Sequence, residues 1–138
     1  MKISARTIQS LCGFQNLIVN KITIENNTLF VNSQTKKTIA YCDNCNQVSR
    51  IRRSSYTRKL SALAISGYRM ILLLKVFKYK CSNPNCTKKI FSQQVKDITV
   101  RYGRRTQSLN NSLLKISIEM SANKAAYLSN IINTPASQ

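Results

Sequence analysis

Four of the five cysteines in this chain form two close pairs, a pattern typical of a metal site. Cys42 and Cys45 lie in the stretch YCDNCN, and Cys81 and Cys86 lie in YKCSNPNCTKK. The Asp, Asn, Ser and Pro residues within the pairs favour tight turns, and a pair of thiolates on a tight turn is a zinc knuckle. Because the chain has no histidine, a single four-ligand site must be all-cysteine. We therefore expect one structural Zn²⁺ ion as the cofactor.

Two disulfides, or unrelated buried cysteines, are the alternatives to zinc. A disulfide between cysteines this close would close a short loop and gain little stability. The N-terminal stretch MKISARTIQS also lacks the long apolar run of a secretory signal, which favours a reducing compartment. The fifth cysteine, Cys12, lies in the apolar stretch from Leu11 to Val19, and we expect it to be a small core residue.

The charge of the chain indicates a polyanionic partner. Lysine and arginine number 22 against 4 acidic residues, which gives a net charge of +18. Residues 36–105 hold 17 of these basic side chains and only two acids, a net charge of +15. A membrane is a poorer partner, because the longest apolar run, Met70 to Leu74, cannot span a bilayer and the cations do not line one helix face. We expect nucleic acid, and neither a membrane nor a small-molecule substrate.

The elements around the first cysteine pair are predicted to be strands. Two β-rich runs, Ile18 to Ile24 and Thr28 to Val31, are separated by Glu25-Asn26-Asn27 and predict a hairpin. The residues that follow are expected to be extended as far as Cys42. After Cys45, the alternating stretch QVSRIRRSSYTRKL predicts an arginine-rich strand at the surface.

The second cysteine pair follows a more apolar strand. Ser66-Gly67 predicts a turn into YRMILLLKVFKYKC, which has an apolar centre between cationic flanks. The residues expected in its core are Leu72, Leu73, Leu74, Val76 and Phe77. The 35 residues between Cys45 and Cys81 are enough for two strands and a connection, so we expect a zinc ribbon, with two knuckles at hairpin ends that face one metal.

The hydrophobic period changes to that of a helix after Arg104. The side chains expected to face inward from a first helix are Leu109, Leu113, Ile116 and Met120, and those from a second helix after Ser121 are Ala125, Leu128, Ile131 and Ile132. Asn133-Thr134-Pro135 is expected to end the second helix, and Ser137 could be an N-cap for another. This is the pattern of a helix-turn-helix without its recognition helix, although any small helical hairpin has the same pattern.

The predicted fold class is α+β, with three segments along the chain. Residues 1–35 form an N-terminal β-hairpin segment, residues 36–103 a basic four-cysteine zinc-ribbon domain, and residues 104–138 a helical segment with an incomplete helix-turn-helix. The cations expected to contact nucleic acid are Arg50, Arg52, Arg53, Arg58, Lys59, Lys75, Lys78, Lys80, Lys88, Lys89, Arg101, Arg104 and Arg105. The alternative for the arginine-rich strand is a solvated sheet edge protected by charge.

Three stretches of this sequence resemble a known family. CDNCNQVSRIRRSSYTRKLSAL, RMILLLKVFKYKCSNPNCTKKIFSQQV and RYGRRT are similar to the N-terminal zinc-finger region of the ISL-three family of insertion-sequence transposases. In that family a C-x-x-C pair is combined with a later C-x-N-P-x-C-x-x-x-x-F segment. The similarity extends from about Cys12-Gly13 to the end of the chain. It implies that the four paired cysteines are zinc ligands, that Arg58 is the arginine of a Y-x-R-x-L stretch and that Phe91 is a packing aromatic.

The chain also departs from the family pattern at two places. Arg53 stands where the family commonly has a histidine, and Ala62-Leu63-Ala64 replaces the family's D-L-P. In the family, this region is followed by a helix-turn-helix and a long catalytic domain with an acidic DDE triad. The resemblance therefore implies the DNA-binding part of a transposase, as a truncated or remnant copy.

Two binding functions and one enzymatic function follow as hypotheses. The first is a zinc-dependent DNA-binding module that recognises the terminal repeats of a mobile element. It would act in the bacterial cytoplasm, at the nucleoid when bound to DNA. A full-length or separate catalytic transposase chain is a further expected partner. The alternative is a basic zinc ribbon that binds structured RNA, in a ribosome-associated role; the lack of a recognisable aromatic platform for RNA bases favours duplex DNA.

Catalysis by this chain is not expected. Two-metal phosphoryl transfer needs clustered carboxylates, and the four acids, Glu25, Asp43, Asp97 and Glu119, share no motif.

Overall fold

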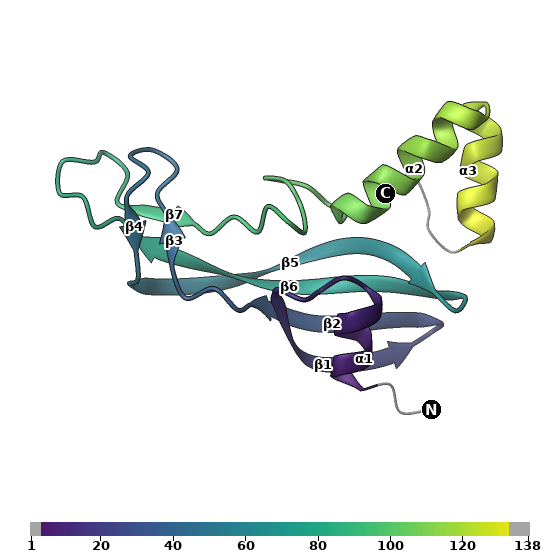
Figure 1. Ribbon diagram of the computed structural model, residues 1–138, viewed down its shortest axis with the longest axis horizontal. Coiled ribbons are helices and arrows are strands. Elements are labelled where there is room, and N and C mark those ends of the chain that lie inside the picture. The colour runs from purple at the N-terminus through teal and green to yellow at the C-terminus, as the bar shows by residue number, and fades with distance from the viewer. Residues whose placement is uncertain (1–3, 133–138) are drawn as a thin grey trace.

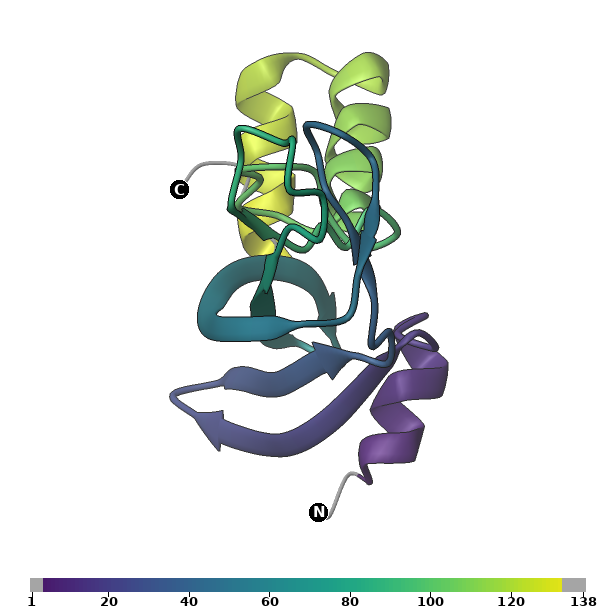
Figure 2. The ribbon, with the colours of Figure 1, turned by 90° about the vertical axis from the view of Figure 1, so that its left-hand side faces the viewer.

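The computed structural model describes residues 4–132, which form a mixed α+β fold, as predicted (Figure 1). The elements in chain order are α1 (Ala5–Leu11), β1 (Leu17–Glu25), β2 (Thr28–Thr35), β3 (Ala40–Tyr41), β4 (Val48–Ser49), β5 (Arg52–Ile65), β6 (Tyr68–Lys80), β7 (Ile90–Ser92), α2 (Gln107–Glu119) and α3 (Ala122–Ile131). The long β5–β6 hairpin runs between two ends of the molecule. The loops that carry the cysteine pairs lie at one end, and the α2–α3 helix pair lies at the other. In the view from the cysteine end, the two helices stand behind these loops (Figure 2).

Strand β6 is the central strand of the main sheet. The sheet has the order β1-β2-β6-β5, and β7 pairs with the far end of β6. β6 is antiparallel to β5 and β7 but parallel to β2, where Val31 faces Leu72. Strands β3 and β4 form a separate two-stranded sheet. The segments 1–35 and 36–103 therefore contribute strands to one sheet.

Both turns expected between strands are confirmed. In the β1–β2 hairpin, Asn26 and Asn27 have φ angles of 48° and 57°, which suit a type I′ turn. In the β5–β6 hairpin, Ser66 and Gly67 have φ angles of 49° and 80°. Asparagine and glycine tolerate such left-handed backbone better than most residues, and this tolerance is the local reason why the chain reverses there.

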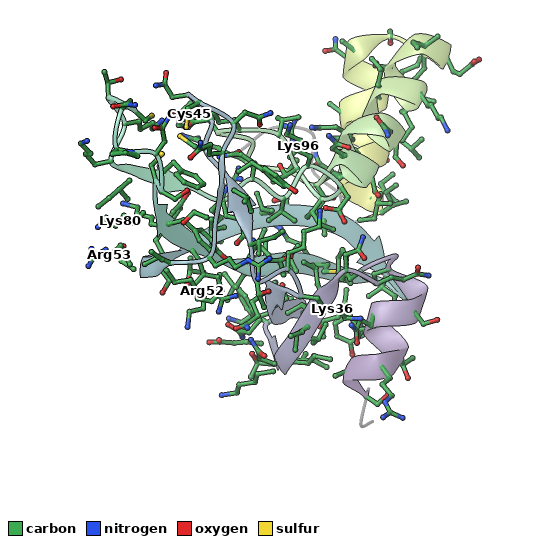
Figure 3. All side chains as sticks on the ribbon, turned by 60° about the vertical axis from the view of Figure 1, so that its left-hand side comes forward. Lys36, Cys45, Arg52, Arg53, Lys80 and Lys96 are labelled. Atoms are coloured by element: carbon green, nitrogen blue, oxygen red, sulfur yellow. The ribbon has the colours of Figure 1, made fainter. Side chains whose placement is uncertain are left out.

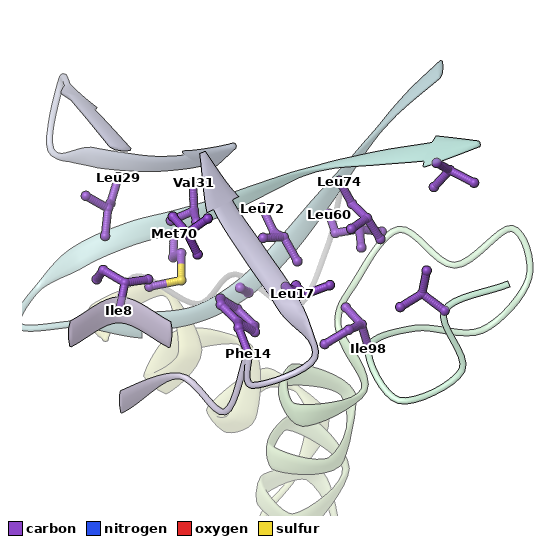
Figure 4. Packing of buried hydrophobic residues seen from close by; sticks show 14 residues of the cluster. Ile8, Phe14, Leu17, Leu29, Val31, Leu60, Met70, Leu72, Leu74 and Ile98 are labelled. Carbon is purple, nitrogen blue, oxygen red and sulfur yellow. The ribbon is translucent and has the colours of Figure 1, made fainter. Parts of the chain in front are cut away.

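The hydrophobic core lies on one face of the main sheet, covered by α1 and the segment 93–99 (Figure 4). α1 is N-capped by Ser4, whose hydroxyl accepts a hydrogen bond from the backbone N–H of Thr7 at 3.2 Å. The buried side chains of this cluster are Ile8, Phe14, Leu17, Val19, Leu29, Val31, Leu60, Ala62, Met70, Leu72, Leu74, Val76, Val95 and Ile98. Cys12 is half-buried and packs against the cluster, in line with its expected role.

The prediction for the apolar centre of β6 is only partly correct. Leu72, Leu74 and Val76 are buried, but Leu73 and Phe77 are only half-buried. Successive side chains of a strand point to opposite faces, so a continuous apolar run cannot place all its members in a core that lies on one side of the sheet. Leu73 and Phe77 lie on the opposite face, together with exposed side chains such as Thr57 and Lys75.

The two helices form as predicted, but most of their apolar side chains are less buried than expected. Thr106 caps α2 through a hydrogen bond from the Leu109 N–H at 3.3 Å, and Leu109 is the one apolar α2 side chain that is fully buried. Ile131 and Ile132 are 58% and 46% exposed, so their inward placement was wrong. The predicted helix end at residues 133–135 and the cap at Ser137 lie outside the described residues.

No helix in residues 4–132 has the length and apolar character needed to cross a bilayer.

Candidate metal centre and cationic surface

Each cysteine pair lies in the loop of a short hairpin. Cys42 and Cys45 lie between β3 and β4, where the Cys42 N–H donates to the Gln47 carbonyl at 2.9 Å and the Asn46 N–H donates to the Cys42 carbonyl at 2.8 Å. Asn46 completes this turn with a φ angle of 61°. Cys81 and Cys86 lie between β6 and β7. We call residues 40–49 together with residues 79–92 the cysteine lobe.

The second loop is closed in a similar way. The Cys81 N–H donates to the Lys89 carbonyl at 2.8 Å, and the Cys86 N–H donates to the Asn83 carbonyl at 3.2 Å. The side-chain oxygen of Asn83 also accepts from the Asn85 N–H at 3.0 Å, a local asparagine turn. The turn-forming residues inside each pair therefore act as the sequence predicts.

The four cysteines come together. All four Sγ atoms lie within 4.8 Å of one another, with 3.9 Å between Cys42 and Cys86 and 3.5 Å between Cys45 and Cys81. These separations are too long for disulfides, which have S–S bonds of about 2.05 Å, and all four thiols are free. Four sulfurs at about 2.3 Å from one zinc ion would be about 3.8 Å apart. The cluster can therefore hold one metal ion.

A small apolar cluster encloses the thiols on the protein side. Tyr79 and Phe91 are 0% and 2% exposed, and their rings stack with centroids 6.0 Å apart. Together with Ala40 they pack around Cys42, Cys81 and Cys86. Phe91 thus occupies the packing position that the resemblance implied. Burial of the ligands in a dry shell strengthens the attraction between thiolates and a cation.

Hydrogen bonds favour the thiolate form at two of the cysteines. The side-chain amide of Asn44 donates to the Cys86 Sγ at 3.2 Å and lowers the pKa of Cys86 to about 7. The backbone N–H of Cys45 lowers the pKa of Cys42. The backbone N–H of Asn83 favours the thiolate of Cys81 as well, but burial and hydrogen bonds with the other thiols raise the pKa of Cys81 to about 12. The thiolate is the form that binds a metal, so binding would release protons.

Polar contacts join the two cysteine loops to each other and to the segment that follows. The carboxylate of Asp43 forms ion pairs with Lys88 at 2.7 Å and with Arg101 at 2.9 Å. The hydrogen bond from Lys88 is the largest cause of the lowered pKa of Asp43. The Ser82 hydroxyl donates to the Val48 carbonyl at 2.8 Å. Lys88 and Arg101, both predicted as phosphate contacts, are therefore partly neutralised within the fold.

Two further arginines predicted to contact phosphate are bound within the fold. The guanidinium of Arg52 lies 3.9 Å from the Phe77 ring centroid and donates to the Tyr79 hydroxyl at 3.2 Å. Arg58 donates to the Val100 carbonyl at 3.1 Å and to the Gly103 carbonyl at 2.6 Å. Both side chains therefore connect β5 to neighbouring segments.

The other nine cations of the predicted set are exposed to solvent, except that Arg105 is only half-exposed. They are Arg50, Arg53, Lys59, Lys75, Lys78, Lys80, Lys89, Arg104 and the half-buried Arg105. Figure 3 shows Arg53 and Lys80 pointing outward beside the cysteine lobe. Arg50 lies in the same region, because the neighbouring residue Ile51 accepts a backbone hydrogen bond from Lys80 at 2.9 Å. We call Arg50, Arg53 and Lys80 the lobe cations.

Substitution of Arg58 is expected to loosen the turn at residues 100–103. Arg58→Met keeps the length and the apolar stem but removes both donors, and a hydrogen bond to a charged group contributes about 1.5–3 kcal/mol, less where water screens it. We expect lower unfolding free energy and faster amide exchange at Gly103. Lys59→Met, at the exposed neighbouring position, is the control. Equal behaviour of the two variants would show that Arg58 is not a structural contact.

Sequence reasoning missed three features of the site. The Asn44 amide donates to a thiol, Tyr79 stacks under the cluster, and the turn at 100–103 is held by Arg58. The sequence did carry a signal for Asn44, since this residue lies between two of the clustered cysteines. The contact of Arg58 spans more than forty residues of sequence, and no sequence signal predicted it.

Scans of this chain against protein-family models, curated proteins and solved structures found no match.

Proposed function

We propose that this chain is a zinc-dependent nucleic-acid-binding module, and that duplex DNA is its ligand. One observation carries the proposal: the four-cysteine cluster lies at the end of the β5–β6 hairpin, where Arg53 and Lys80 project outward and Arg50 is exposed. In this function the zinc ion is structural, the hairpin loops form a zinc ribbon, and the lobe cations contact phosphates. Phosphate contacts supply affinity and position, so cations held on a rigid element suit the role.

The wider charge distribution supports a polyanionic ligand. The net charge of the chain is +18, and the described residues form only two ion pairs, both with Asp43. Lys59 and Lys75 lie on the face of the sheet opposite the core, whereas the lobe cations lie at its end. The positive surface therefore extends beyond one strand, which favours a ligand with many phosphates over a single anionic group.

Binding is a better role for the chain than catalysis. Asp43 forms ion pairs with Lys88 and Arg101, and Asp97 accepts a hydrogen bond from Asn16 at 2.9 Å. Glu25 ends β1 and Glu119 ends α2, so the four acids occupy four separate places in the fold. A two-metal phosphoryl-transfer site would need such groups together.

The resemblance in sequence makes the proposal more specific. As in the DNA-binding region of ISL-three family transposases, the ligand would be the terminal repeats of a mobile element, and the partner would be a full-length or separate catalytic transposase chain. In this role the chain acts in the bacterial cytoplasm.

Structured RNA is the second candidate. On the open face of the sheet, the half-buried Phe77 ring has Arg52 3.9 Å and Lys75 5.4 Å from its centroid. An aromatic ring with cations on a sheet face is a feature that RNA-binding sheets use.

The proposal is tested by comparing three ligands in zinc-containing buffer: duplex DNA with the element's terminal repeats, random duplex DNA and hairpin RNA. With about six phosphate contacts, the logarithm of affinity should fall against the logarithm of salt with a slope of about −5. Tightest binding to the terminal repeats supports the transposase role, and tightest binding to the hairpin supports RNA. Affinity that does not depend on salt would refute both.

A further inference from the structure

Tyr102 is the most exposed large hydrophobic side chain of the described residues, at 85%. It lies in the turn of residues 100–103, which connects the segment after β7 to α2. Its φ angle is 60°, in the left-handed region where a side chain crowds its own backbone. The other four non-glycine residues with positive φ in residues 4–132 are asparagine or serine, which are small and polar. A tyrosine in this conformation is therefore an outlier in the fold.

The neighbouring glycine does not explain this outlier. A Cβ atom at Gly103 would lie 2.6 Å from the Thr99 hydroxyl oxygen and 3.0 Å from the Val100 carbonyl oxygen, so close packing requires glycine there. At position 102 the backbone also favours glycine or asparagine, yet the residue is an aromatic one. Because the ring is almost fully exposed, burial in the core does not offset its unfavourable conformation.

Several contacts hold the turn in place. Arg58 donates to the carbonyls of Val100 and Gly103, and the Gly103 N–H donates to the Val100 carbonyl at 3.0 Å. The Thr99 hydroxyl donates to the Arg105 carbonyl at 2.8 Å. Arg101 is paired with Asp43 in the cysteine lobe. The Tyr102 ring therefore projects from a backbone that is fixed to both β5 and the cysteine lobe.

The surroundings of the ring are cationic. The Arg101 guanidinium lies 5.3 Å from the ring centroid, and Arg104 is exposed two residues further on. An exposed aromatic face beside an arginine is an arrangement that binds a nucleic-acid base by stacking. Because Arg101 is paired with Asp43, Arg104 is the cation here that can neutralise an adjoining phosphate.

We propose that Tyr102 stacks on an unpaired base of the DNA that this module binds. The proposal rests on the function proposed above. Inside a regular duplex both faces of a base are covered by its neighbours, so the ring needs a base at a duplex end, in an overhang or at a distorted step. The ligand of the whole surface is then a duplex that carries an unpaired base beside the cysteine lobe.

Fluorescence can test this directly, because the chain contains no tryptophan. Tyr102→Trp introduces a single tryptophan at the turn, and Tyr127→Trp introduces one on α3, where the native tyrosine is 71% exposed. Zinc-loaded variants are titrated with a blunt duplex and with the same duplex carrying a short single-stranded overhang. We expect strong quenching by the overhang duplex in Tyr102→Trp and little in Tyr127→Trp. Equal quenching in the two variants would overturn the proposal.

Affinity measurements separate stacking from folding. Tyr102→Gly should not lower the melting temperature, since glycine adopts a positive φ without strain. It should nevertheless weaken binding of the overhang duplex by roughly 5- to 150-fold, the usual effect of losing one stacked base. Tyr102→Phe should retain the native affinity for the overhang duplex. The affinities of the variants for the blunt duplex should differ little from one another.

The possible failures can be told apart. If Tyr102→Gly binds the overhang duplex as tightly as the unsubstituted chain, the role of Tyr102 is wrong, while the proposed DNA-binding function stands. If the unsubstituted, zinc-loaded chain binds neither duplex in a dye-labelled anisotropy assay, both are wrong.

Discussion

Removal of zinc from the loaded protein is expected to unfold the cysteine lobe and to leave the main sheet folded. The lobe has a small apolar cluster, centred on Tyr79 and Phe91, and only short strands. Zinc contributes on the order of 10–16 kcal/mol in small zinc domains, which exceeds what such a cluster can supply. The main sheet has a separate and larger core around Leu72 and Leu74. The two parts should therefore respond differently to a chelator.

Amide exchange measured by NMR, with and without a chelator, tests this prediction. Protection should be lost at Tyr79 and Phe91 and retained at Leu72. Cys81→Ser should reproduce the chelated state and bind much less than one zinc ion per chain. Cys12→Ala is the matched control, because Cys12 lies outside the cluster and should leave one zinc ion per chain. A spectrum that does not change after complete removal of metal would show that the cluster is not a structural metal site.

Neutralisation of the lobe cations is expected to cause a large loss of DNA affinity. Arg50, Arg53 and Lys80 are all exposed, and their charged groups form no ion pair with the described acids. Each phosphate contact contributes about 0.9 to the slope of log affinity against log salt, so the triple Gln variant should have a slope shallower by about three units. The same relation gives a loss of roughly a hundredfold in affinity at 0.15 M salt.

The control for this experiment removes the same charge elsewhere. Arg6 on α1, Lys21 on β1 and Lys115 on α2 are exposed, and their triple Gln variant also lowers the net charge by three. We expect the control to bind nearly as the unsubstituted chain does, apart from a small general effect of charge. If both variants lose the same affinity, binding depends on total charge and the lobe cations are not the contact surface.

The clustering of Cys42, Cys45, Cys81 and Cys86 was the part of the site that the sequence predicted best. Residue type, paired spacing and turn-forming neighbours are local signals, so they do not depend on contacts with distant parts of the chain. The hairpin turns at Asn26-Asn27 and Ser66-Gly67 were predictable for the same reason. Composition likewise identified a positively charged surface.

Contacts between distant segments were not predictable. The parallel pairing of β2 with β6 joins a hairpin near the N-terminus to the central strand. Neither stretch of sequence contains a signal that identifies the other as its partner. The cationic side chains of Arg52 and Arg58 look the same in the sequence as that of Arg53, but their partners in the fold differ. Ile131 was placed inward by its period, which shows an apolar stripe but not whether another element covers it.

The central position of β6 has a consequence for how the chain acquires its structure. Val31 pairs with Leu72, which lies 41 residues later, so β2 gains its second neighbour only after more than half of the chain has been synthesised. Such non-local contacts slow folding, because a long loop must close before the contacts stabilise it. Metal capture by Cys42, Cys45, Cys81 and Cys86 would close the loop between residues 45 and 81 and fix the end of β6. Bound zinc would then speed the folding of the whole sheet, and chains without it would fold more slowly even where their final sheet is the same.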